Sequence, residues 1–323
     1  MMEIALAVVS LVALAAMLYL AGELLVSGLL YIAKYFQIRE FMVAFFVMAF
    51  AASIPNLLVG VTSALQGMPE LSFGDIMGNN MVALTVAIGL AILFAPKKEI
   101  PLENKTVQDM TFVTAIAALL PILLLADGVL SQADGVVLLL FFACYVYWMY
   151  DRRDLFSKVY EEGKIERTAA ERKLVLRAIL KAVVGVTLLA VTAQLVVYAA
   201  SLVSTAFGVP LILMGLVVLG FSGALPEVYF TIISARKGET SLIMGNLMGA
   251  VIVPASFVLG VVAVIHPIEN KDLEFPVIAR IFLVIVAAFF LYMSRTKNVV
   301  TWRESIILLS IYALFIAALV WAW

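Results

Sequence analysis

The stretch Phe50-Ala51-Ala52-Ser53-Ile54-Pro55-Asn56 recurs in the second half of the chain as Phe221-Ser222-Gly223-Ala224-Leu225-Pro226-Glu227. The offset that carries Asn56 onto Glu227 also places Gly74-Asp75-Ile76-Met77-Gly78 on Gly245-Asn246-Leu247-Met248-Gly249. Two unrelated apolar segments would pair Leu with Val by chance, but they would not align a proline with a proline and glycines with glycines. The chain therefore contains an internal repeat with a constant offset, and its two halves are expected to share one fold.

Composition places both halves in a membrane. Hydrophobic residues make up 65% of the chain and charged residues 13%, whereas soluble domains carry about 25% charged residues. About 20 consecutive apolar residues cross a bilayer as a helix. We predict ten such spans, at residues 3–33, 41–66, 73–95, 109–126, 129–150, 172–204, 209–235, 241–266, 275–294 and 301–322. The predicted fold class is an all-α membrane protein with five transmembrane helices in each repeat.

The charged segment 151–171 separates the two halves. We predict a first repeat over residues 1–150, a linker over 151–171 and a second repeat over 172–323. The linker is too short to hold a separate domain, so its charges are interpreted as a solvated face and a topology signal.

Lys and Arg are distributed unevenly between the two sides of this topology. Of the 21 basic residues, 19 lie in or beside the loops that follow the odd-numbered spans, and only Lys271 and Arg280 lie on the other side. Cytoplasmic loops carry such an excess. We therefore expect an integral protein of the cell (plasma) membrane with both termini outside and the 151–171 loop in the cytoplasm. An odd number of spans per repeat inverts the second repeat relative to the first, which is typical of secondary transporters.

Several other classes of function are disfavoured. The net charge is −1 and no basic face is present to bind nucleic acid, so the expected partners are the lipid bilayer and small inorganic cations. The HExxH and Gly-x-Ser-x-Gly patterns are missing, so no enzyme activity is expected. The single cysteine, Cys144, cannot form an intrachain disulfide and is interpreted as a small core residue. The oligomeric state stays open.

Polar side chains at mid-span are costly in hydrocarbon, and here they gather beside the two repeated prolines. Ser53 and Asn56 flank Pro55 in the second span, and Ser222 and Glu227 flank the equivalent proline in the seventh. A proline inside a helix leaves carbonyl oxygens of the preceding turn without a hydrogen bond. Such oxygens beside a carboxylate are the hard ligands that a cation prefers.

The freed carbonyls are expected near Ala49 and Gly220, in the turns that precede the two prolines. The next span of each repeat adds more polar groups, namely Asp75, Asn79 and Asn80 in the third span and Asn246 in the eighth. Glycines in the same turns permit close approach of helix backbones. We therefore predict that the second, third, seventh and eighth spans cross at the membrane midplane and bring oxygen ligands together from both repeats.

Two further ionisable residues have competing interpretations. Glu23 in the first span has Gln194 as its repeat mate, and it is expected to pair within the bundle rather than to bind an ion. His266, the only histidine, ends the eighth span beside a proline. A wetted position at the membrane interface is favoured there over a proton relay.

These motifs resemble those of the calcium/cation antiporter superfamily, specifically its sodium/calcium exchanger branch. That family carries two inverted repeats, each with a G-T-S-L-P-E motif in its second helix and a G-N-x-x-G-S-N-x-x-N/D motif in its third. The counterparts here are Ala51–Asn56 with Gly74–Ala83, and Ser222–Glu227 with Gly245–Pro254. The stretches Gly22–Gly28 and Gln194–Val197 resemble the family's long gating helices.

The resemblance implies sodium/calcium exchange by alternating access, with helices 1 and 6 sliding across a fixed core. It carries Glu227 and Ser53 over directly as ion ligands, and Asn56 and Asn79 as substituted polar groups. The carbonyls of Ala49 and Gly220 carry over by position. No cofactor is expected beyond the transported cations, calcium and sodium.

The family's ligand set is incomplete in this sequence. A glutamate ends both G-T-S-L-P-E motifs in the family, whereas the first copy here ends in Asn56. Calcium takes six to eight oxygens and its affinity follows the charge of its ligands. Asp75 would restore a second charge if it faces the site. Exchange of another cation, a proton-coupled variant and a transport-inactive homologue therefore stay as alternatives.

Overall fold

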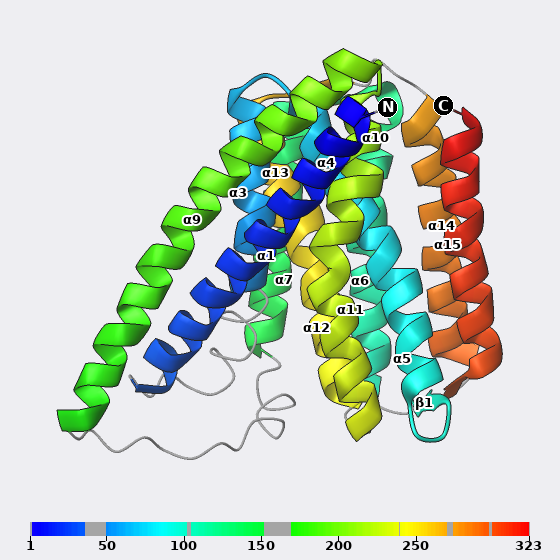
Figure 1. Ribbon diagram of the computed structural model, residues 1–323. Coiled ribbons are helices and arrows are strands. Elements are labelled where there is room, and N and C mark those ends of the chain that lie inside the picture. Colours follow the sequence, from blue (N-terminus) through cyan, green and yellow to red (C-terminus); the bar gives the residue numbers. More distant parts are fainter. Residues whose placement is uncertain are drawn as a thin grey trace.

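The computed structural model describes residues 2–35, 50–101, 105–151, 169–238, 240–269, 274–296 and 299–322, and nearly all of them are helical (Figure 1). The first half contains α1 (Met2–Tyr35), α3 (Ala51–Leu65), α4 (Pro69–Val82), the π-helix η2 (Ala83–Ala87), α5 (Ile88–Phe94), β1 (Glu99–Pro101), α6 (Lys105–Leu124), η3 (Leu125–Asp127), β2 (Val129–Leu130) and α7 (Gln132–Asp151). The second half contains α9 (Ala169–Phe207), α10 (Leu211–Leu213), the π-helix η5 (Met214–Leu219), α11 (Gly220–Lys237), α12 (Thr240–Ile252), the π-helix η6 (Val253–Val258), α13 (Leu259–Ile265), β3 (Ile268–Glu269), α14 (Glu274–Thr296), β4 (Val299–Thr301) and α15 (Trp302–Ala322).

Within the described ranges, five helices are long and apolar enough to cross a membrane. They are Pro69–Phe94, Gln132–Asp151, Lys173–Phe207, Asn246–Ile265 and Trp302–Ala322. A sixth span results if the bent pair Leu211–Leu225 and Glu227–Arg236 is counted as one, and the shorter apolar helices are Ala16–Leu29, Ser53–Leu65, Thr111–Asp127 and Val277–Met293. The prediction of a helical membrane protein is confirmed.

Burial separates central helices from peripheral ones. In the apolar 18-residue stretch of the Pro69–Phe94 span 83% is buried, and in that of the Asn246–Ile265 span 78%, whereas the corresponding share for the Trp302–Ala322 span is only 22%. A peripheral membrane helix exposes apolar side chains to lipid at little cost, because lipid tails are as apolar as leucine. The two central spans are therefore the ones placed to hold polar groups away from lipid.

Local sequence signals set where these helices begin and end. Pro69 stands at the first turn of α4 with Glu70 beside it, as suits a helix N-terminus. Gly67, which follows α3, and Gly238, which follows α11, have φ angles of 73° and 75°. This left-handed conformation favours glycine and closes the end of a helix. The two glycines are also repeat mates, so the repeat extends to the helix ends.

The short strands follow the repeat as well. β1 pairs antiparallel with β4, and β2 pairs antiparallel with β3. The repeat offset carries Val129 of β2 onto Val300 of β4. Each ladder thus joins an element of the first half to one of the second half, and β2 and β4 occupy equivalent positions in the two repeats.

The two longest helices lie side by side at one flank of the molecule, where α1 and α9 run with a similar tilt (Figure 1). They cross at glycines. A Cβ atom on Gly28 would lie 2.6 Å from the carbonyl oxygen of Ala178, and one on Gly185 would lie 2.7 Å from the backbone nitrogen of Leu25. Small residues let membrane helices approach this closely, so that dispersion contacts between the backbones hold the pair together.

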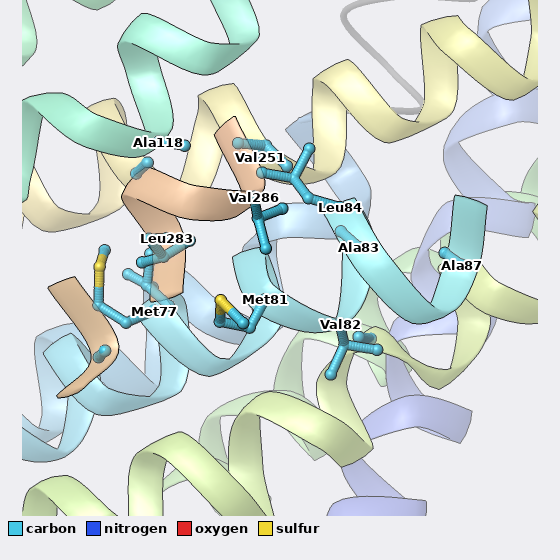
Figure 2. Close-up of a cluster of buried hydrophobic side chains, with 14 of the residues drawn as sticks. Met77, Met81, Val82, Ala83, Leu84, Ala87, Ala118, Val251, Leu283 and Val286 are labelled. Atoms are coloured by element: carbon cyan, nitrogen blue, oxygen red, sulfur yellow. The ribbon is translucent and has the colours of Figure 1, made fainter. Parts of the chain in front are cut away.

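The main apolar cluster joins the central helices to α14 (Figure 2). Met77 and Met81 of α4 lie near Leu283 and Val286 of α14, with Val251 of α12 beside them. All five side chains are fully or almost fully buried. Flexible methionines fill irregular gaps between helices, so this cluster forms a packed wall next to the polar face of α4.

Some sequence-based expectations fall outside the described residues or are wrong. Residues 41–49, including Ala49, and most of the 151–171 linker lie outside them. Cys144 is exposed on α7 rather than buried in the core, because the side chains of α7 that reach the core are others, such as Tyr145. His266 is exposed, with its Nδ1 2.9 Å from the carbonyl oxygen of Pro267, which agrees with an interfacial position.

Candidate cation site

The site begins with a crossing of α4 and the η5–α11 segment at which the two backbones touch. A Cβ atom on Gly74 would lie 2.2 Å from the carbonyl oxygen of Ile212, and one on Gly78 would lie 2.2 Å from that of Leu216. From the other helix, a Cβ on Gly220 would lie 2.6 Å from the Cα of Gly78. Any larger residue would push the helices apart. The glycines therefore set the distance between the polar faces of the two repeats.

The helix that carries Glu227 is bent at this level. Leu211–Leu225 and Glu227–Arg236 meet at an angle of 45°, as expected where a proline interrupts the helical hydrogen bonds. The turn before the bend is also irregular, because the Ser222 hydroxyl donates to the carbonyls of Val218, at 2.7 Å, and Leu219, at 3.1 Å. In α3, Pro55 packs against α1, where a Cβ on Gly22 would lie 3.1 Å from its Cγ.

The Glu227 side chain places an oxygen inside the bundle. Its Oε2 is buried and has no hydrogen-bond partner within the described structure. Its backbone carbonyl accepts a 2.5 Å hydrogen bond from the Thr231 hydroxyl, and that hydroxyl oxygen accepts a 3.4 Å bond from Nδ2 of Asn246. A buried carboxylate oxygen without a donor is costly, so its chemistry fits a bound cation.

Asp75 and Asn56 reach the same place from two other helices. Asp75 is 4% exposed on α4. A Cβ on Gly223 of α11 would lie 3.8 Å from its Oδ1 and 3.9 Å from Oδ1 of Asn56. Glu227 follows Gly223 by one helical turn on α11. Oxygen-bearing side chains from α3 and α4 thus meet beside a glycine of α11, one turn before the buried Glu227 carboxylate.

Other predicted site residues lie at the edge of this group. Asn79 is buried and donates from Nδ2 to the carbonyl of Ala250 at 3.0 Å, whereas its Oδ1 has no partner within the described structure. Ser53 is buried on α3. Gly220 contacts the α4 backbone directly. Asn246 contacts Thr231 and reaches Glu227 only through it.

Two buried hydroxyls were not singled out by the sequence. Thr231 stands four residues after Glu227, a spacing that puts both on one face of a helix, so a helical wheel would have found it. Ser72 is buried on α4, and its Oγ has no partner within the described ranges. A Cβ on Gly60 would lie 2.8 Å from that Oγ, a contact between two helices that no local pattern reveals.

The donors gathered here are carboxylate, amide, hydroxyl and carbonyl oxygens, a set suited to hard cations such as sodium and calcium rather than to zinc or copper. Within the described residues no group of three or more His, Cys, Asp and Glu that could hold a metal is found. Two carboxylates, Asp75 and Glu227, are therefore the charged members of the candidate set.

Comparison with known families decides the class of protein. The model of the family described as "Sodium/calcium exchanger protein" matches residues 6–150 and 178–321. The chain belongs to the sodium/calcium exchanger family. The match covers both halves of this exchanger homologue and omits the middle segment, as expected for two repeats joined by a linker.

Curated relatives carry names that agree with this family. The exchanger homologue is 28% identical to the putative antiporter CaxA of Alkalimonas amylolytica over 253 residues, which cover 76% of this chain and 77% of that protein. It is 27% identical to the inner membrane protein YrbG of Escherichia coli over 269 residues, 79% of this chain and 78% of that one. It is 19% identical over 325 residues to the sodium/calcium exchanger MaX1 of Methanosarcina acetivorans, covering 89% and 91%.

A solved structure shares the fold. The sodium-calcium exchanger NCX_Mj, soaked with sodium and strontium, matches with a TM-score of 0.64 at 22% identity, over 97% of this chain and 98% of that chain. The exchanger homologue therefore shares the fold of NCX_Mj over nearly its whole length, and the family match places it among the cation antiporters. The resemblance read from the repeated motifs is confirmed.

Proposed function

We propose that this exchanger homologue is a secondary active antiporter that binds a transported cation between α3, α4, α11 and α12 and exposes it to each side of the membrane in turn. The observation that carries the proposal is the buried Glu227 Oε2 without a hydrogen-bond partner in the described structure. One turn before it on α11, the Asp75 and Asn56 oxygens meet beside Gly223. The proposed ligands are the side chains of Glu227, Asp75, Asn56, Ser53 and Asn79, with Asn246 as support and the carbonyls of Ala49 and Gly220 by position.

The proposed architecture has ten transmembrane helices in two inverted five-helix repeats, over residues 1–150 and 172–323. Both termini lie outside the cell membrane, and the 151–171 linker lies in the cytoplasm. Support comes from contacts between equivalent positions, since the hydrogen bond from Asn79 to Ala250 joins two repeat mates. Inversion supports alternating access, because one site then serves two equivalent routes.

The number of negative charges in the proposed site favours the exchange of calcium for sodium. Asp75 and Glu227 together carry two negative charges, which neutralise one calcium ion or two sodium ions in a low-dielectric site. The amide oxygen of Asn56, the hydroxyl of Ser53 and the carbonyls add neutral oxygens toward the six to eight that calcium takes. We propose no cofactor beyond these transported cations.

The test is flux in proteoliposomes. Calcium uptake driven by an outward sodium gradient is expected for the wild type, and Glu227→Gln should abolish it. Glu99→Gln, which removes an exposed carboxylate of β1, is the matched control and should transport normally. Uptake driven by a proton gradient instead of sodium would favour the proton-coupled alternative, and equal fluxes for wild type and Glu227→Gln would contradict the proposed site.

Thermal unfolding separates the remaining alternatives. A cation that binds only the folded protein raises the unfolding temperature, and it does so more strongly the higher its affinity. Stabilisation by calcium that disappears in Glu227→Gln supports the proposed pair. Stabilisation by another cation alone would name a different substrate, and stabilisation by no cation at all would indicate a transport-inactive homologue.

A further inference from the structure

The two repeats differ in charge at the positions that surround the site. At three pairs of repeat mates one half carries a carboxylate and the other a carboxamide: Glu23 with Gln194, Glu227 with Asn56, and Asp75 with Asn246. The side chains are close in shape in the first and third pairs, Glu227 is one methylene longer than Asn56, and every pair differs in charge. A fold with two equivalent routes to its centre is therefore built with unequal electrostatics along them.

The first route passes between α1 and α11, which are in contact. Tyr19 and Glu23 stand one turn apart on α1, and both are exposed, Tyr19 by 38%. The groups whose charges act on the Tyr19 hydroxyl are Glu23 on its own helix and Tyr229 and Glu227 on α11. A polar strip thus leads from the surface of α1 to the central carboxylate.

Glu23 is exposed rather than packed into the bundle, so the expectation that it pairs there is wrong. It lies well inside the apolar length of α1, within Ala16–Leu29. A carboxylate at such a position is costly in hydrocarbon and normally faces a water-filled space. The exposed face of Glu23 is therefore assigned to water that borders the α1–α11 contact.

The second route is the equivalent one between α9 and α3, which are also in contact. Its residues follow from the repeat offset, and all of them are uncharged: Ala190 for Tyr19, Gln194 for Glu23, Asn56 for Glu227 and Leu58 for Tyr229. Ala190 and Gln194 are exposed on α9, as their mates are on α1. The second route thus uses equivalent positions of the two repeats but has neither the charges nor the phenols of the first.

We propose that the two approaches to the cation site are electrostatically unequal: the α1–α11 approach, lined by Glu23 and Tyr19, attracts cations, and the α9–α3 approach is neutral. Resting on the proposed antiport, the inference adds that Glu23 is an entry residue that raises the local cation concentration. Clefts lined by one sign of charge raise counter-ion concentration and association rates by about 10-fold or more.

The acidic approach has a direction. Beyond Tyr229, α11 runs on to the end of the molecule where β1 lies (Figure 1), which is the cytoplasmic end in the proposed topology. The exchanger would thus capture a scarce cation from the cytoplasm and release it through a neutral route, where no carboxylate along the path holds it back.

Thiol chemistry tests this without requiring transport. In a Cys144→Ser background, Tyr19→Cys and Ala190→Cys each provide one thiol, and each is treated with a cationic and an anionic methanethiosulfonate of similar size. The ratio of the two rates, normalised to free cysteine, is expected to be about 10 or more at Tyr19→Cys and near 1 at Ala190→Cys. Adding Glu23→Gln should lower the first ratio severalfold, and adding Gln194→Glu should raise the second.

Equal rate ratios at the two positions would overturn the inference, and so would a ratio at Tyr19→Cys that does not change when Glu23→Gln is added. Failure of the thiols to react with either reagent would overturn it as well. In a transporting preparation, Glu23→Gln should raise the KM for calcium severalfold from the cytoplasmic side only and leave the maximal rate unchanged. Absence of any flux in the wild type would count against the proposed antiport, whereas the thiol ratios would still decide the inequality of the two approaches.

Discussion

At the scale of single residues, the proposed site has its two carboxylates on α4 and α11. The second span ends its motif in Asn56, whereas Asp75 of α4 supplies a carboxylate whose Oδ1 lies beside the same glycine as the Asn56 amide oxygen. In the proposed site a cation would thus meet two carboxylates, one of them from α4 instead of α3. Ligand charge is what tunes calcium affinity.

Removing this charge should weaken cation binding. Asp75→Asn leaves the shape of the side chain unchanged but deletes one of two carboxylates, and we expect calcium affinity to fall by about 100-fold. The double variant Asp75→Asn with Asn56→Asp restores the charge on the neighbouring helix and should recover most of the affinity. Calcium-dependent thermal shift measures both. Full binding by Asp75→Asn alone would show that Asp75 is not a ligand.

At the scale of elements, the α4–α11 crossing decides whether the ligands meet. The glycines at the crossing are in backbone contact. At Gly223, one turn before Glu227, the Asp75 and Asn56 oxygens lie at ordinary van der Waals distance from the Cβ position. The same residue type therefore serves packing at one place and ligand access at the other. The sequence pattern does not distinguish these glycines from one another. Their different surroundings become visible only in the packed helices.

This difference predicts unequal effects of one methyl group. Gly78→Ala would place a Cβ 2.2 Å from the carbonyl oxygen of Leu216, and overpacking of this kind costs about 1–3 kcal/mol. Gly223→Ala has no atom nearer than 3.8 Å and should unfold at nearly the wild-type temperature. Thermal unfolding in detergent compares the two. A Gly223→Ala variant as destabilised as Gly78→Ala would contradict the geometry of the crossing.

At the scale of the whole molecule, the two halves interlock through equivalent elements. α1 packs on α9, each strand ladder joins the two halves, and Asn79 bonds to its own repeat mate. Because both halves contribute to the core and to the candidate ligands, neither half holds the complete site.

The hydrogen bond from Asn79 to Ala250, which joins the two halves, is expected to contribute measurably to the free energy of unfolding. Asn79→Ala removes the 3.0 Å hydrogen bond to Ala250, and hydrogen bonds between membrane helices average about 0.6 kcal/mol with a maximum near 1.7. Asn80→Leu is the matched control, because neither amide atom of the buried Asn80 has a partner within the described residues. Asn79→Ala should lower the unfolding temperature, whereas Asn80→Leu should not. An equal decrease of the unfolding temperature in both variants would contradict a stabilising role of the Asn79–Ala250 hydrogen bond.

Inversion of the repeats predicts opposite sidedness for repeat mates. In a Cys144→Ser background, Gln66→Cys follows α3 and Lys237→Cys ends α11, and these two positions are equivalent under the repeat offset. A membrane-impermeant thiol reagent should label the first from outside and the second from the cytoplasm. Labelling of both from one side would mean that the halves are inserted in parallel.

The amino-acid sequence determined the repeat, the helical membrane class and the family, because prolines, glycines and apolar runs act locally and recur at a fixed offset. It also picked out Glu227 and Asp75 as candidates. It did not reveal that Glu23 is exposed, that Cys144 lies outside the core, or that Thr231 and Ser72 line the polar interior.

Those points depended on which faces of the helices turn toward one another. In a membrane, lipid and helix interior are equally apolar, so hydrophobic periodicity does not distinguish an inner face from an outer one. The tertiary structure alone decided which oxygens meet around Gly223 and which side chains border the two approaches, because backbone contact at the glycines sets the distances between the helices.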